Sequence, residues 1–168
     1  MSKKIDFFKD KYLAEAEKFL RGNPDVFTKK ECTLYRKDLL DYLSDPPPKE
    51  DNARILVVLA NKEVCGLIMF EKEEESRDYY RILWLVIKKS EQRKGYGTLL
   101  IKEMVKKIKR FGGKHIIVET SDEPRNKKVK KFYQKFGFKK IGVLPDYYPP
   151  PILKHKHPED SIIYFKDL

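Results

Sequence analysis

The chain has 168 residues and a formal net charge of +11, from 37 basic and 26 acidic residues. This length fits one domain with its own hydrophobic core. No run approaches the roughly 20 apolar residues of a membrane-spanning helix, and the N-terminus has neither the apolar segment nor the cleavage site of a signal peptide. Cys32 and Cys65 are too few for a disulfide framework and lack partners spaced for a metal. We therefore expect two buried thiols in a reducing compartment, and a cytoplasmic protein without a membrane segment.

The positive charge is compatible with three kinds of partner: nucleic acid, acidic peptides or an anionic cofactor. The basic residues are spread over several predicted helices and form no single tract. This distribution favours a lysine-rich surface that reflects overall composition, and it argues against nucleic acid as the main partner.

Two helices are predicted in the N-terminal part of the chain. Apolar residues recur at helical spacing over 5–21. A second helix starts at a capping box of Thr28 and Glu31, in which each side chain satisfies the other's backbone N–H. The prolines at 46–48 end this helix, because proline cannot continue it.

The rest of the chain alternates between strands and helices. Short apolar runs bounded by turn residues predict strands, and apolar residues at helical spacing predict helices. The predicted strands span 54–60, 64–70, 79–87, 115–120, 138–144 and 161–166; the predicted helices span 100–111 and 126–136; a long loop spans 145–159. The run from Leu83 to Ile87 is so apolar that we expect it to be buried on both faces. This order predicts an α/β (α+β) fold, with a mixed central sheet flanked by helices.

The loop before the helix at 100–111 reads Gln92-Arg93-Lys94-Gly95-Tyr96-Gly97, followed by Thr98. The first turn of a helix presents unpaired N–H groups and the positive end of the helix dipole, and this combination binds phosphate. Glycine lets the backbone approach such an anion closely. The loop is neither a P-loop, which needs Lys-Ser or Lys-Thr after its last glycine, nor a Rossmann fingerprint, which needs a small residue at position 100. The remaining alternative is an ordinary strand-to-helix turn.

Three segments resemble, in their order and spacing, the motifs of the GNAT N-acetyltransferases. The pattern Gln/Arg-x-x-Gly-x-Gly at 92–97 is similar to the acyl-CoA pyrophosphate loop of this family. Asn126 followed by a Tyr-x-x-x-Gly-Phe ending at 133–138 resembles the second motif, and the segment 160–165 resembles the closing strand. The resemblance implies the GNAT acyl-CoA N-acyltransferase fold.

The resemblance covers residues 28–168. We therefore expect a single GNAT domain over 1–168, composed of a helical N-terminal extension over 1–27 and a core over 28–168. Proteins of this family begin with a strand, whereas this sequence predicts a helix there. The sequence thus differs from the family pattern at the N-terminal edge of the sheet, and whether a strand exists there stays open.

The implied reaction moves an acetyl group from acetyl-CoA to a primary amine by direct attack in a ternary complex, without a metal. A backbone N–H of the strand before the loop would hold the oxyanion, and the same strand would pair with the pantetheine arm. The residues implied in cofactor binding are Leu85, Val86, Ile87, Gln92, Arg93, Lys94, Gly95, Tyr96, Gly97, Thr98, Asn126 and Tyr133. Arg93, Lys94, Lys130 and Lys131 form a basic cluster that suits the polyanionic CoA. Asn126 is also a natural helix N-cap.

Two residues are implied in catalysis. Tyr133 matches the family tyrosine that donates a proton to the leaving thiolate; its alternative role is a half-buried aromatic on a helix. Glu119 ends a strand in a position where some GNAT enzymes that acetylate protein N-termini carry a basic glutamate; its alternative role is a carboxylate in water. Asp78 and Asp122 are weaker candidates for the base.

Tyr147 and Tyr148, in the proline-rich stretch before the last strand, are the candidates for substrate binding. They resemble the loop that closes over the acceptor in peptide-acetylating GNAT enzymes, and tyrosine offers an amphipathic contact surface. His155 and His157 lie in the same stretch, but two residues in a loop do not make a metal site.

The favoured function is thus an acetyl-CoA-dependent N-acetyltransferase that works as a monomer or a homodimer. The alternative is a basic CoA-binding or nucleic-acid-binding regulatory module without turnover. The acceptor stays open, since a peptide N-terminus, a lysine, a polyamine and a small antibiotic amine are all compatible with the sequence.

Overall fold

The computed structural model describes residues 3–22, 29–44, 54–123, 126–148 and 158–168. Its strands are β1 (Lys3–Phe7), β2 (Arg54–Ala60), β3 (Glu63–Lys72), β4 (Tyr79–Ile87), β5 (His115–Ser121), β6 (Lys139–Tyr148) and β7 (Glu159–Asp167). Its helices are α1 (Leu13–Arg21), α2 (Lys29–Ser44), α3 (Tyr96–Arg110) and α4 (Lys127–Lys135), with short 3-10 turns η1 (Asp10–Tyr12) and η2 (Lys89–Glu91).

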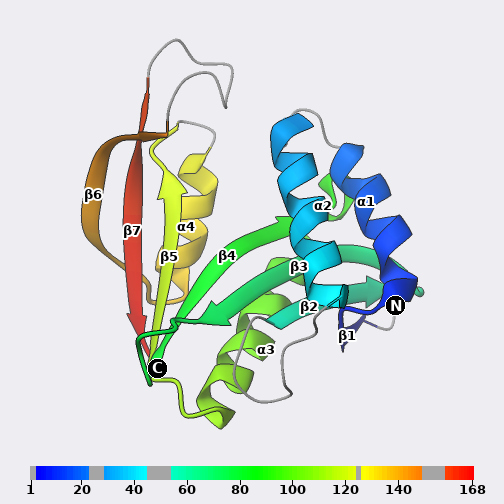
Figure 1. Cartoon of the computed structure of the whole chain (residues 1–168), viewed down its shortest axis with the longest axis horizontal. Coiled ribbons are helices and arrows are strands. Elements are labelled where there is room, and N and C mark those ends of the chain that lie inside the picture. Colours follow the sequence, from blue (N-terminus) through cyan, green and yellow to red (C-terminus); the bar gives the residue numbers. More distant parts are fainter. Residues whose placement is uncertain (1–2, 23–28, 45–53, 124–125, 149–157) are drawn as a thin grey trace.

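The strands form one mixed seven-stranded sheet in the order β1-β2-β3-β4-β5-β7-β6. The β4–β5 pair is parallel, and the other pairs are antiparallel. Helices α1 and α2 cover one face of the β1–β4 half, α3 covers its other face, and α4 lies against β5 (Figure 1). The predicted fold class, a mixed sheet flanked by helices, is confirmed.

The predicted helix over 5–21 is wrong at its start. Residues Lys3–Phe7 form an edge strand that pairs antiparallel with β2, with Ile5 opposite Val58. Helix α1 begins only at Leu13. The spacing of apolar residues over such a short segment is compatible with both a strand and a helical turn. The segment forms a strand because it can pair with the edge of β2. The sheet therefore has the N-terminal strand whose presence the sequence left open.

The sheet separates two hydrophobic cores. Ile68, Leu100, Met104 and Ile116 belong to the core on the α3 and α4 side, and all four are fully buried. The core under α1 and α2 includes the fully buried residues Ala16, Leu39, Ile55, Val57 and Leu67. Alternate residues of β2 and β3 serve opposite cores, which is why these strands read as continuous apolar runs.

The expectation that Leu83–Ile87 is buried on both faces is only partly met. Trp84 and Val86 are buried against α1 and α2, but Leu83 is 39% exposed. Leu83 is the extra residue of a bulge, because β3 pairs Met69 with Trp84 and then Phe70 with Ile82. The exposure of Leu83 marks the point at which β4 loses its second neighbouring strand.

The predicted loop over 145–159 also needs correction. Its first residues continue β6 up to Tyr148, which pairs with Glu159 across an irregular register. The segment 149–157, with its two histidines, lies outside the described residues. No helix in the described part of the chain is long and apolar enough to cross a membrane.

Candidate active site

Strands β4 and β5 run together only at their beginnings. Their parallel pairing extends from Tyr79 opposite His115 to Ile82 opposite Val118. Strand β4 stays paired with β3 as far as Ile87 and curves away from β5, which stays paired with β7 along its whole length (Figure 1). In the described part of the chain, the β5-facing edge of Leu83–Ile87 therefore has no strand beside it. An extended ligand with amide groups can pair with such an edge.

The predicted phosphate loop lies at the end of this free edge. After η2, Arg93 and Gly95 adopt left-handed backbone conformations, with φ of 64° and 88°, and α3 starts at Tyr96. Gly95 occupies the N-cap position, and no side chain caps the helix there. The first N–H groups of α3 are thus available for an external anion, with the positive end of the helix dipole behind them.

The two glycines of the loop do different things. A Cβ on Gly95 would have nothing within 4 Å, so this residue faces open space. A Cβ on Gly97 would lie 3.2 Å from Cζ of Phe132 and 3.8 Å from Cγ1 of Ile87. Gly97 therefore allows α3 and α4 to pack closely. A side chain at Gly97 would thus meet α4, whereas a side chain at Gly95 would enter the open space where an anion could approach the loop.

The other residues of the loop mainly stabilise its conformation. The side chain of Gln92 donates to the carbonyl oxygen of Ile87 at 3.3 Å and ties the loop to the end of β4. Tyr96 is buried in the core, so only its backbone faces the loop. Lys94 pairs with Glu91 at 3.0 Å. Arg93 is exposed and Thr98 is half-buried.

A residue that sequence reasoning missed also holds the loop. Nζ of Lys3, on β1, donates to the carbonyl oxygen of Lys94 at 2.9 Å and lies 4.9 Å from the centre of the Tyr96 ring. This contact joins residues 91 positions apart. Only the pairing of β1 with β2 brings Lys3 to the loop, so no local sequence signal pointed to it.

Asn126 and Tyr133 frame the other side of the strand separation, at the start and on the inner face of α4. Asn126 occupies the N-cap position without capping the helix; its side chain donates to Oγ of Ser121 at 2.8 Å. Tyr133 is 4% exposed and packs against Phe132 and Phe138. Burial, and then the nearby Tyr35, raises the pKa of Tyr133. The phenol is therefore protonated across the neutral range.

Tyr35, on α2, is a second residue that sequence reasoning left in the core. It packs on Trp84 with ring centroids 5.3 Å apart. Burial raises the pKa of Tyr35, and Glu31, Asp38 and Tyr148 add to this effect. Tyr35 of α2 also acts electrostatically on Tyr133 of α4, and Tyr148 of β6 acts on Tyr35.

Glu119 is not a free carboxylate in water. One of its oxygens forms an ion pair with Nη1 of Arg81, and the other accepts a hydrogen bond from Oγ of Ser161 at 3.4 Å. Nε of Arg81 also pairs with Glu73 at 2.5 Å. The last residue of β5 that pairs with β4 is Val118, and Glu119 follows it directly. The ion pair between Arg81 and Glu119 therefore bridges the two strands at the point where they separate.

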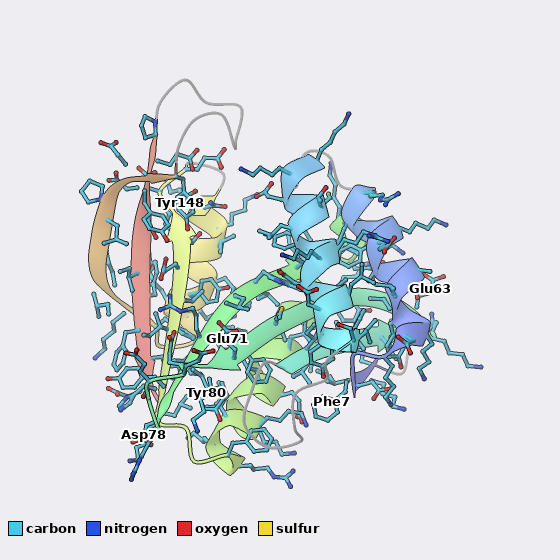
Figure 2. All side chains as sticks on the ribbon, in the orientation of Figure 1. Phe7, Glu63, Glu71, Asp78, Tyr80 and Tyr148 are labelled. Carbon is cyan, nitrogen blue, oxygen red and sulfur yellow. The ribbon has the colours of Figure 1, made fainter. Side chains whose placement is uncertain are left out.

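Tyr147 and Tyr148 end β6, with their rings 5.0 Å apart and nearly perpendicular. Tyr147 is 52% exposed, and Tyr148 is half-buried. Figure 2 places Tyr148 far from Asp78, which lies where β4 and β5 meet. A hydrogen bond from Lys114 at 2.7 Å lowers the pKa of Asp78. Asp122 accepts a hydrogen bond from the backbone N–H of Asp160 at 3.1 Å, next to the Glu159 that pairs with Tyr148, so both weaker base candidates have structural partners but only Asp78 lies away from the tyrosines.

The described residues contain no group of three or more metal-ligating side chains. The predicted pair His155 and His157 lies outside these residues. The arrangement described so far consists of a free strand edge, an anion-binding helix start and titratable side chains on the opposite side. These features suit a long, phosphate-bearing ligand with an amide chain.

Comparison with known proteins agrees with this geometry. The family model for the acetyltransferase (GNAT) family matches residues 16–138. A crystal structure from Desulfovibrio desulfuricans, described as a GNAT-family acetyltransferase, is similar with a TM-score of 0.86 and 17% identity, covering 99% of each chain. The ribosomal-protein-S18-alanine N-acetyltransferase of Escherichia coli has a TM-score of 0.76 and 15% identity, over 99% of this chain and 94% of that one.

An aminoglycoside 6'-N-acetyltransferase complexed with coenzyme A has a TM-score of 0.72 and 18% identity, over 98% of this chain and 96% of that chain. These identities are low, so the structural likeness speaks for the fold. No curated protein matches the sequence. The family model, which spans most of the chain, decides the assignment: this chain belongs to the GNAT family of acetyltransferases.

Proposed function

We propose that the chain transfers an acetyl group from acetyl-CoA to a primary amine by direct attack in a ternary complex. The observation that carries this proposal is the parting of β4 and β5 beside the start of α3. The free edge of Leu83–Ile87 suits the amide groups of a pantetheine arm. The N–H groups after Gly95 suit a diphosphate.

In this proposal acetyl-CoA supplies an activated acetyl group as a thioester. The N–H of Lys88 donates to Cys65 on β3, and N–H groups alternate in direction along a strand, so those of Leu85 and Ile87 face the free edge and would stabilise the oxyanion of the tetrahedral intermediate. Tyr133 would protonate the leaving thiolate, a role supported by its place on the inner face of α4 beside the strand separation. Asn126 would contact the pantetheine arm with the rest of its hydrogen-bonding capacity.

The acceptor side is formed by Tyr35, Tyr147 and Tyr148, with Glu119 as the proton acceptor. An alkyl ammonium has a pKa near ~10 and must lose a proton before it attacks. The ion pair with Arg81 and the bond from Ser161 support a Glu119 carboxylate that is fixed in orientation.

We also propose that the chain acts as one domain. β1 pairs with β2 and α1 packs on the same sheet, which supports a domain that includes the first residues of the described chain. The expected helical extension over 1–27 thus contains an edge strand, Lys3–Phe7, in addition to α1.

The test is calorimetry with acetyl-CoA followed by a panel of amines, with release of free CoA thiol as the signal. The panel contains peptides with different N-terminal residues, lysine, a polyamine and an aminoglycoside, because the relatives are named for a ribosomal-protein alanine and an aminoglycoside. Binding of acetyl-CoA with turnover of at least one amine supports the proposal. Binding without turnover of any amine supports the regulatory module instead, and absence of binding refutes both.

A further inference from the structure

Strand β6 is one of the two outer strands of the sheet, and its exposed side chains are largely apolar. In the described part of the chain, β6 pairs only with β7, so its other edge has no strand beside it (Figure 1). Of the eight large hydrophobic side chains that are exposed among the described residues, four lie on this one strand; they are Ile141, Val143, Leu144 and Tyr147. An uncovered edge with apolar side chains is a surface on which another strand can pair.

The other outer strand, β1, is better protected. It begins with Lys3 and Lys4, and charged side chains on an edge oppose pairing with a further strand. Its exposed aromatic side chain, Phe7, has Nζ of Lys107 only 4.0 Å from the centre of its ring. Of the two edges, β6 is therefore the one suited to accept a strand.

The sequence of β6 is complementary to itself when two copies run antiparallel. The regular part of its pairing with β7 is centred on Val143, which lies opposite Ile162. A two-fold axis perpendicular to a sheet keeps every side chain on its own face, so the axis passes between one residue and its own copy. With Val143 at this centre, Lys140 and Asp146 lie three residues away on either side, and each lysine faces the aspartate of the other copy. Both side chains are exposed.

The neighbouring two-fold registers lack this pairing of charges. Centring the pair on Gly142 places Lys140 opposite Leu144, and centring it on Leu144 places Lys140 opposite Tyr148. Of these three registers, the one centred on Val143 gives the lysine an opposite charge. Opposite charges that face each other across an antiparallel pair stabilise it and fix its register.

We propose that β6 is the interface of a homodimer, in which the β6 strands of two copies pair antiparallel about Val143 and form one continuous sheet. The interface uses the same surface of both copies, so it closes, and the edges that stay free are the two protected β1 strands. Each copy has a net charge of +11, which opposes association in general, but the Lys140 and Asp146 pairs place opposite charges where the copies meet. Pro145 has no N–H, so the hydrogen-bonded stretch is short and burial of the apolar side chains supplies most of the stability.

The first test is the mass of the full chain in solution, measured by sedimentation velocity over a range of concentrations. One copy has a mass of 20.0 kDa, and we expect a species of twice this mass. Val143→Lys places two lysines side by side at the centre of the interface and should raise the dimer Kd by about a hundredfold. Val129→Lys on α4 is the matched control, because Val129 is 38% exposed and Val143 is 37% exposed; it should keep the parental Kd. A parent chain that is monomeric at every concentration, or equal effects of the two variants, overturns the proposal.

A charge swap tests the register. Lys140→Glu places a glutamate opposite Asp146 of the second copy and should weaken the dimer. Adding Asp146→Lys restores opposite charges and should recover it. The backbone of Asp146 has a φ of 51°, and Lys62 already adopts a φ of 71° in this chain, so lysine is compatible with that conformation. A double variant no stronger than Lys140→Glu alone refutes the pairing about Val143.

A cross-link tests the centre of the interface with a smaller change, and it decides the matter if Val143→Lys does not fold. Directly opposite residues of an antiparallel pair have Cα atoms about 4.5–5.5 Å apart, which is within the range of a disulfide. Under mild oxidation, Val143→Cys should therefore migrate at twice the mass of one copy on a non-reducing gel, whereas Val129→Cys and the parent should not. Absence of this cross-link, or its equal formation in Val129→Cys, overturns the proposal.

Discussion

Gly95 offers the sharpest test of the phosphate loop, because the chain contains a matched control. Gly95, with φ of 88°, lies before the first residue of α3, and Gly112, with φ of 80°, lies just past its other end. A Cβ at either position would have nothing within 4 Å. Alanine at either site therefore introduces the same backbone strain and no clash.

The strain sets the expected change in stability. A left-handed conformation costs an L-residue roughly 1–2 kcal/mol relative to glycine. For a chain of this size, each kcal/mol lowers Tm by about 2–4 °C. Gly95→Ala and Gly112→Ala should thus each lower Tm by about 2–8 °C, and by similar amounts, which differential scanning calorimetry can measure.

The two variants should differ in ligand binding. In Gly95→Ala the new methyl group occupies the open space in front of the helix start and keeps the diphosphate away from its N–H groups. Loss of one charge-assisted hydrogen bond costs roughly 1.5–3 kcal/mol, which corresponds to about a tenfold to hundredfold rise in Kd for acetyl-CoA. Gly112→Ala should keep the parental Kd. An unchanged Kd in folded Gly95→Ala would refute the assignment of this loop to the diphosphate.

Three further predictions concern the surroundings of the strand separation. Tyr133→Phe keeps the ring packing and removes the proton donor, so kcat should fall by about 10²–10⁴-fold at unchanged Kd for acetyl-CoA; a change within about twofold would leave Tyr133 as a core aromatic only. Lys3→Met removes the donor to the Lys94 carbonyl and should weaken acetyl-CoA binding without changing the KM of the amine, as steady-state kinetics will show. Burial raises the pKa of Asp38, which accepts a hydrogen bond from Trp84 at 3.1 Å. A raised pKa means that the charged form destabilises the fold as the pH rises, so the Tm of Asp38→Asn relative to the parent should be higher at pH 7 than at about pH 4, near the usual pKa of aspartate; the reverse trend would contradict this reasoning.

The sequence by itself determined those features whose cause is local. The two-residue turn at Asn61 and Lys62, the apolar runs of β2 and β3, and the amphipathic spacing of α3 are encoded within a few residues of one another. The glycine-bearing loop before α3 is local too, since its backbone conformation depends on residues 93–95. Such features follow from steric preference and from the period of the apolar residues.

The tertiary structure decided the features that depend on residues distant in the chain. Lys3–Phe7 is a strand because β2 offers it an edge, and a short spacing alone could not distinguish this from a helical turn. Gly97 turned out to face Phe132 of α4, although its motif suggested a place beside phosphate. The side of Gly97 that faces Phe132 is determined by how α4 packs on α3, which the spacing of the motif does not reveal.

The acceptor side shows the same dependence most clearly. Glu119 could be marked from the sequence, but its ion pair with Arg81 and its bond from Ser161 required β4, β5 and β7 to lie in register. The electrostatic effect of Tyr148 on Tyr35 likewise depends on how α2 and β6 are placed in the fold. Hydrogen bonds and ion pairs act over a few ångströms, so which side chains form them is set by strand order and register, which the local pattern of residues does not contain.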